Sequence, residues 1–102
     1  MSVEKLKIIF SKTGDLRFIS HLDLIRLFQR ASRRADLPVT MNKGFNPRLK
    51  ISISRALKLG ISSAAEEVIF YMDRPVGAET FINAMNGELP DGVRIEKVEE
   101  LN

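Results

Sequence analysis

The chain has 102 residues, of which 44% are hydrophobic, and it contains no cysteine. A chain of this length buries roughly two-thirds of its unfolded surface around one core, so we expect a single domain over residues 1–102. Without cysteine, disulfides, thiolate nucleophiles, zinc–thiolate sites and cysteine-bound iron–sulfur clusters are excluded. No segment approaches the ~20 apolar residues of a membrane helix, and the N-terminus lacks the pattern of an export signal. We therefore expect a cytoplasmic protein with no membrane partner.

The net charge of +3 conceals a strong asymmetry along the chain. Residues 1–58 carry thirteen basic and four acidic side chains, whereas residues 59–102 carry three basic and nine acidic side chains. The balance is therefore +9 in the first segment and −6 in the second. A segregated positive segment attracts polyanions, but two oppositely charged segments can also neutralise each other in the fold. The sequence leaves both interpretations open.

The first part of the chain predicts a strand, a turn and a helix. Residues 5–10 alternate lysines with apolar residues, the period-two pattern of a half-buried strand, and Gly14 in the following turn is free to adopt a positive φ. Ser20 and Asp23 form a capping box, which predicts the start of a helix that continues to Ala35.

The two faces of this predicted helix differ in chemistry. An apolar stripe at helical spacing consists of Leu24, Phe28, Ala31 and Ala35. The opposite face gathers four guanidinium groups at positions i, i+4, i+7 and i+8, namely Arg26, Arg30, Arg33 and Arg34. Because arginine favours bidentate contact with phosphate, this face predicts anion binding. Docking of an acidic protein surface, or a solvated face without a partner, are the alternatives.

The remaining sequence predicts further strands and one more helix. A short extended piece at residues 39–41 precedes strands at 51–54 and 66–72, the latter being central, and a helix at 78–87 precedes a strand at 93–98. This order predicts an α+β fold of the ferredoxin-like β-α-β-β-α-β type, an antiparallel sheet with both helices on one face. Against the helix residues Leu24, Phe28, Ala31, Phe81 and Met85 we expect to find Leu6, Ile8, Phe10, Ile51, Ile53, Ile69, Tyr71 and Val93, or their immediate alternates.

The loop at residues 42–50 is the clearest candidate binding segment. Its basic residues can meet phosphates, while Phe45 could stack on a base for roughly 1–3 kcal/mol if exposed. Phe45 can equally fill the core beside a glycine that only permits the turn. This loop adds five residues to the arginines as candidate nucleic-acid-binding positions: Lys43, Phe45, Asn46, Arg48 and Lys50.

His21 is the only histidine and lies in the first turn of the predicted helix. Helical spacing turns it toward the apolar side with Leu24 and Phe28, which favours a hydrogen-bonded packing role. A neutral imidazole could instead act as a general base on a ribose hydroxyl, as in a metal-independent ribonuclease. Asp15 with Asp23 is too weak a constellation for a metal site. We expect no metal, no cofactor and no activity of the chain's own, with His21 as the one weak catalytic candidate.

Three segments of the sequence carry a family resemblance. The block FSKTGDLRFISHLDL at residues 10–24, with Gly-Phe-Asn-Pro at 44–47 and Lys-Ile-Ser at 50–52, resembles the radical-SAM-linked domain of unknown function. The resemblance implies a bacterial domain, stand-alone or fused C-terminal to a radical S-adenosylmethionine (SAM) module, without an established activity. It also implies a genomic setting near ribonuclease E/G and ribosomal genes. Such domains usually continue past the position of Asn102, so we expect this chain to be the N-terminal part of a longer unit.

The resemblance has two departures that bear on function. Related domains often carry His-Pro where this chain has Arg48 and Leu49, which argues against a histidine role in this loop. The three cysteines of a radical SAM cluster are missing, so the cofactor would belong to a partner protein. We therefore expect foremost a non-catalytic RNA-binding module that presents substrate to a radical SAM protein in cis or in trans. The alternatives are a docking domain for an acidic partner and the ribonuclease based on His21.

Overall fold

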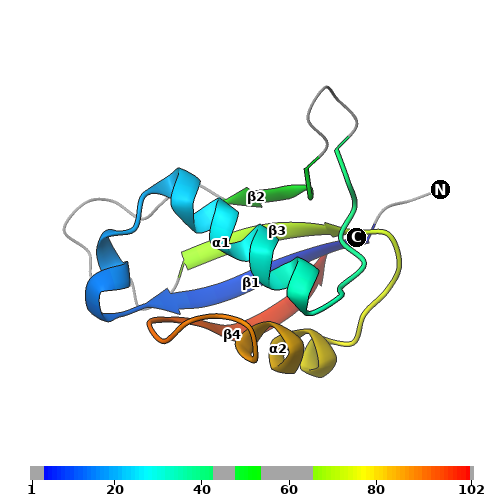
Figure 1. Ribbon diagram of the computed structural model, residues 1–102. Helices are drawn as coiled ribbons and strands as arrows, with labels where there is room; N and C mark the ends of the chain where they lie inside the picture. The colour runs from blue at the N-terminus through cyan, green and yellow to red at the C-terminus, as the bar shows by residue number, and fades with distance from the viewer. Residues whose placement is uncertain (1–3, 43–47, 54–65, 102) are drawn as a thin grey trace.

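A computed structural model describes residues 4–42, 48–53 and 66–101 of the chain. This part is a small α+β fold in which two helices lie against an open four-stranded antiparallel sheet (Figure 1). No helix in these ranges has the length and apolar composition needed to cross a membrane. In chain order the elements are β1 (Glu4–Lys12), the 3-10 helix η1 (Gly14–Phe18), α1 (His21–Arg34), β2 (Ile51–Ile53), β3 (Glu66–Met72), α2 (Ala78–Asn86) and β4 (Val93–Leu101).

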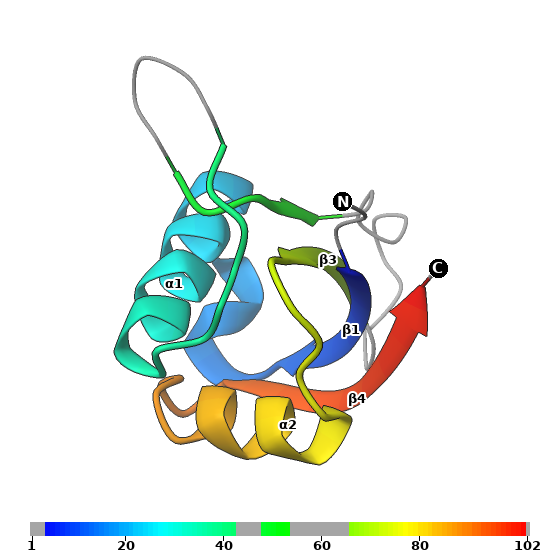
Figure 2. The same cartoon turned by 90° about the vertical axis from the view of Figure 1, so that its right-hand side faces the viewer.

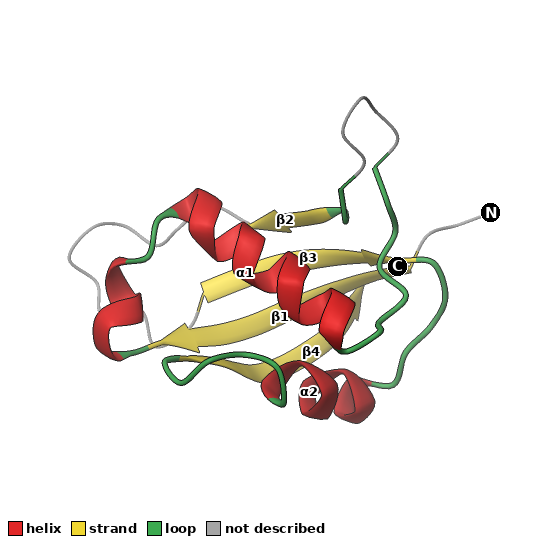
Figure 3. Cartoon of the chain, in the orientation of Figure 1, coloured by secondary structure: helices red, strands yellow, loops and turns green. Residues whose placement is uncertain are grey.

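The sheet has the strand order β2-β3-β1-β4, and each neighbouring pair is antiparallel (Figure 3). The two central strands, β1 and β3, are paired in the fold although they are far apart in the sequence. β4 covers the free edge of β1, and the short strand β2 covers the free edge of β3. The basic N-terminal strand thus lies between two strands that come from the acidic part of the chain.

Most element boundaries agree with the sequence predictions. The predicted helix cap is confirmed, because the Ser20 hydroxyl accepts a hydrogen bond from the Asp23 backbone N–H at 3.1 Å. Gly14 has a φ of 60° and opens η1, a 3-10 helix that the sequence did not predict. β4 runs on to Leu101 because it stays paired with β1 as far as Lys5. The extended piece at 39–41 forms only isolated bridges to Met72 and Leu49.

A chain of four phenylalanine rings joins both helices to the sheet. Phe28 of α1 lies 5.0 Å from Phe10 of β1 and 5.8 Å from Phe70 of β3, measured between ring centroids. Phe81 of α2 lies 5.1 Å from the same Phe70. All three contacts are edge-to-face, the geometry that the ring quadrupoles favour. Because both helices contact Phe70, they cover the same face of the sheet (Figure 2).

The prediction for β3 allowed two registers, and the structure has the alternate one. Ile69 and Tyr71 are only half-buried, while their alternates Val68, Phe70 and Met72 are fully buried against the helices. A shift of one residue moves every side chain of a strand to its other face, and a nearly unbroken apolar run gives no polar alternation to fix that choice. The other expected core residues are inward, with Ile53 partly buried: Leu6, Ile8, Phe10, Leu24, Phe28, Ala31, Ile51, Phe81, Met85 and Val93.

Truncation of Phe28 tests this packing. Phe28 is 0% exposed and contacts two other rings, so Phe28→Ala should lower the free energy of unfolding by roughly 3–5 kcal/mol, measured by denaturant titration. The matched control is Phe18→Ala, because Phe18 is 78% exposed and its truncation should change stability by less than about 0.5 kcal/mol. Similar losses in the two variants would contradict the observed orientation of α1.

Candidate anion-binding surface

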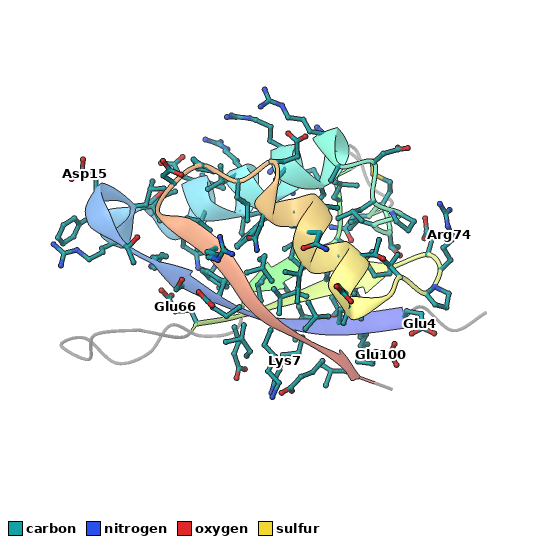
Figure 4. All side chains as sticks on the ribbon, turned by 90° about the horizontal axis from the view of Figure 1, so that it is seen from below. Glu4, Lys7, Asp15, Glu66, Arg74 and Glu100 are labelled. Atoms are coloured by element: carbon teal, nitrogen blue, oxygen red, sulfur yellow. The ribbon has the colours of Figure 1, made fainter. Side chains whose placement is uncertain are left out.

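The outer face of α1 carries the four predicted arginines. The inward face buries Leu24, Phe28 and Ala31, so the opposite side of the helix points to solvent. Nitrogen-tipped side chains project from α1 away from the sheet in Figure 4. The four exposed arginines line a shallow hollow together with Gln29: Arg26, Arg30, Arg33 and Arg34. The four arginines therefore share one exposed face, and anion binding by this face stays a prediction.

Acidic side chains pair with two lysines of β1, Lys7 and Lys12. Lys7 Nζ in β1 lies 3.7 Å from a carboxylate oxygen of Glu67 in β3 and 3.3 Å from one of Glu99 in β4. Lys12 Nζ lies 2.9 Å from Glu66, and both side chains are largely buried. These carboxylates come from the acidic second segment of the sequence, so mutual neutralisation of the two segments takes place within the sheet.

The arginines of α1 are not neutralised in this way. Arg26 lies 3.7 Å from Asp23, but Arg30, Arg33 and Arg34 form no ion pair with any described residue. Glu88 lines a neighbouring hollow beside Arg30 and Arg34 without pairing with them. All thirteen Asp and Glu residues lie within the described ranges, so the chain has no further acidic side chain to offer. Mutual neutralisation of the two segments therefore does not extend to these three arginines.

The basic surface continues from α1 toward the edge of the sheet. Gln29, which lines the arginine hollow, donates a hydrogen bond from Nε2 to the backbone carbonyl of Leu49 at 3.3 Å. Leu49 is buried, and Arg48 and Lys50 on either side of it are exposed. Two predicted loop residues are therefore brought next to α1. The other three lie outside the described residues: Lys43, Phe45 and Asn46.

Tyr71 and Lys5, which lie near this surface, were not among the predicted site residues. The Lys50 ammonium lies 4.3 Å from the ring centroid of Tyr71, and the Lys5 ammonium lies 5.6 Å from it. Tyr71 was assigned to the core, so its contact with two cations was not foreseen. The outward lysines of β1 were the available signal, because Tyr71 is paired directly with Lys5 in the sheet.

The predicted burial of His21 was wrong. His21 is the first residue of α1 and is exposed, as are its neighbours Leu22 and Asp23. The buried stripe begins only at Leu24, so helical spacing alone could not place the imidazole. No group of three or more His, Cys, Asp or Glu side chains suited to a metal ion occurs among the described residues.

Residues 5–102 match a protein family described as "Uncharacterized protein conserved in bacteria (DUF2344)". The match covers nearly the whole chain, and the description names no activity, cofactor or partner. Neither a curated protein nor a solved structure matches the chain.

The ion pairs of the sheet predict a pH dependence of stability. Hydrogen bonds from Lys97 and then Lys7 hold the pKa of Glu99 below its ordinary value of 4.5. A carboxylate whose folded-state pKa is depressed stabilises the fold above its unfolded pKa and loses that effect as pH falls through the folded-state pKa. Glu99→Gln should therefore melt below the wild type at neutral pH, and the difference should narrow as the pH falls below 4.5, as measured by thermal denaturation.

The same network acts at alkaline pH. Glu99, followed by Glu67, raises the pKa of Lys7 above 10.5. The stabilising effect of Lys7 is therefore present below that pH and is lost as pH rises through the folded-state pKa.

Glu88→Gln is the matched control for the melts of Glu99→Gln, because Glu88 forms no ion pair in the described ranges. A melting difference for Glu99→Gln that stays constant in acid would contradict the assignment.

Proposed function

The chain belongs to the DUF2344 family of uncharacterized bacterial proteins, and we propose that it is a non-catalytic module that binds RNA through the phosphate groups of the strand. The observation that carries the proposal is the outer face of α1, where only one of four exposed guanidinium groups, that of Arg26, has a carboxylate partner among the described residues. An arginine without an acidic partner keeps its planar fork of N–H donors for a ligand, and that fork matches phosphate oxygens.

The spacing of the arginines supports a repeating anion as the ligand. Arg26, Arg30 and Arg34 follow each other at four-residue intervals, which places their backbones about 6 Å apart along the helix axis. A row of cations can contact successive phosphates of one strand, and such contacts set affinity without reading sequence. Arg48 and Lys50 extend this row beyond the helix, so the proposed interface is longer than α1 alone.

An acidic protein partner is the second candidate, and one observation favours it. Phe18 is 78% exposed and Leu22 is 48% exposed at the N-terminal end of α1. Apolar side chains beside arginines are the mixture found at protein–protein interfaces. Binding to single-stranded RNA and to polyglutamate of equal length at the same salt concentration separates the candidates. We expect RNA to bind more tightly, and tighter binding of polyglutamate would favour protein docking.

The fold itself is proposed to be of the ferredoxin-like β-α-β-β-α-β type. The strand order β2-β3-β1-β4, the antiparallel neighbours and the placement of both helices on one face support this assignment. Many RNA-binding modules use this architecture, although the architecture alone does not determine function.

Presentation of RNA to a radical SAM protein is proposed from the sequence resemblance of residues 10–24. The chain has no cysteine, so a partner would have to supply the iron–sulfur cluster and its cofactor. A pull-down in which this chain is mixed with a purified radical SAM protein of the same bacterium tests this part of the proposal. Failure of the two proteins to associate, with and without RNA, would remove it and leave RNA binding unaffected.

The salt dependence of RNA binding tests the α1 interface. Each phosphate neutralised on a single strand contributes a log–log slope of about −0.7, so four to six contacts should give a slope of roughly −3 to −4. Arg30→Gln combined with Arg34→Gln should make the slope shallower by about one to two units, as measured by fluorescence anisotropy of a labelled strand. Both side chains are exposed, so the thermal melt should stay close to that of the wild type.

A variant with the same change in net charge is the control. Arg74 and Arg94 are exposed and lie outside α1, so Arg74→Gln with Arg94→Gln removes two positive charges elsewhere. This variant should keep a slope close to that of the wild type. Equal effects of the two double variants would mean that only net charge matters and would contradict a specific α1 interface.

A further inference from the structure

The face of the sheet opposite the helices carries Tyr71. Tyr71 belongs to β3 and is paired with Lys5 of β1, and its side chain is half-buried. Figure 4 shows Lys7 pointing away from the helices. Because side chains alternate along a strand, Lys5 points to the same side as Lys7, and its partner Tyr71 does so too. No helix of the described ranges covers this face.

Two ammonium groups lie close to the Tyr71 ring. Lys50 Nζ is 4.3 Å and Lys5 Nζ is 5.6 Å from the ring centroid, both within the ~6 Å over which a cation and an aromatic face attract. Neither lysine forms an ion pair with a described residue. Two like charges held beside one ring repel each other, so an anion that contacts both is favoured there.

Two other lysines of this face are paired with carboxylates. Lys7 pairs with Glu67 and Glu99, and Lys97 lies 3.1 Å from Glu99. Lys5 and Lys50, beside Tyr71, thus differ from Lys7 and Lys97 in having no carboxylate partner among the described residues. This end also lies beside the basic surface of α1, because Lys50 follows Leu49, whose carbonyl accepts the hydrogen bond of Gln29.

We propose that Tyr71, Lys5 and Lys50 form a binding position for one unpaired nucleotide of an RNA strand. The base stacks on the phenol ring in place of an ammonium group, and the two lysines move to its phosphates. This inference rests on the proposed function and adds the substrate class. It requires single-stranded RNA, because a base that is paired and stacked inside a duplex cannot reach the ring. The strand would pass from α1 over the edge of β2 to the open face of the sheet.

The intrinsic fluorescence of the protein gives a direct test. Tyr71 is the only tyrosine and the chain has no tryptophan, so tyrosine emission reports on this ring alone. Oligouridylate of about ten nucleotides, within the ~4–16 nucleotide range of single-strand sites, should quench the emission to saturation. Inorganic polyphosphate and an RNA duplex of equal length should bind the basic surface without comparable quenching. Free N-acetyltyrosinamide in the same titration corrects for absorbance by the strand.

Substitutions at the ring and at the lysines provide the second readout. Tyr71→Phe retains the stacking surface and should bind labelled oligouridylate within about twofold of the wild type, whereas Tyr71→Ala should weaken binding roughly 5- to 150-fold, which corresponds to about 1–3 kcal/mol. Lys5→Gln with Lys50→Gln should also make the salt slope shallower by about one unit. Lys97→Gln is the matched control, because Lys97 is already paired with Glu99.

The outcomes separate this inference from the proposed function. Quenching by oligouridylate together with selective loss in Tyr71→Ala supports the nucleotide position. Anisotropy that reports RNA binding without quenching, and with wild-type affinity in Tyr71→Ala, overturns this inference and leaves the α1 interface intact. Equal quenching by inorganic polyphosphate also overturns it, because no base is present to stack. Failure of any strand to bind at low salt overturns both proposals.

Discussion

The contacts of Phe28 with Phe10 and Phe70 fix the rotation of α1 about its own axis, and the exposed charge of the molecule depends on that rotation. At about 100° per residue, the four arginines lie roughly 140° to 240° around the helix from Phe28. Burying this one ring therefore turns all four guanidinium groups toward solvent. The same chain of rings holds α2 through Phe81, so packing of the core and exposure of the cationic face are set together.

The strand order explains which charges are neutralised. β1 is the basic strand and lies between β3 and β4, both of which come from the acidic segment of the chain. Carboxylates of these neighbours therefore reach Lys7 and Lys12 across the sheet. Lys7 and its partners lie on the face opposite α1, and Arg30, Arg33 and Arg34 of α1 pair with none of the described carboxylates. The basic residues of the first segment are therefore divided between the sheet, where Lys7 and Lys12 are paired, and α1, where most of the arginines are not.

Local signals in the sequence were sufficient for the elements but not for every orientation. The Ser20 cap and the apolar stripe of α1 are short-range patterns, and both were predicted correctly. The register of β3 depends on its neighbours, since residues 68–72 are all apolar, and the sequence therefore left open whether Tyr71 lies in the core or on the side of Lys5 and Lys50. The exposure of His21 depends on which residues of α1 contact the core, and burial starts only at Leu24. The candidate position Phe45 lies outside the described residues, so its role in the loop stays a prediction.

The central claim is that RNA contacts the outer face of α1 and the adjoining edge of the sheet. Backbone amide NMR spectra of the protein, recorded during titration with oligouridylate at low salt, test this claim residue by residue. The account predicts the largest chemical-shift changes at residues 26–34, with further changes at residues 48–50 and at Tyr71. Changes confined to α2 and β4, or unchanged spectra at saturating strand concentration, would contradict it.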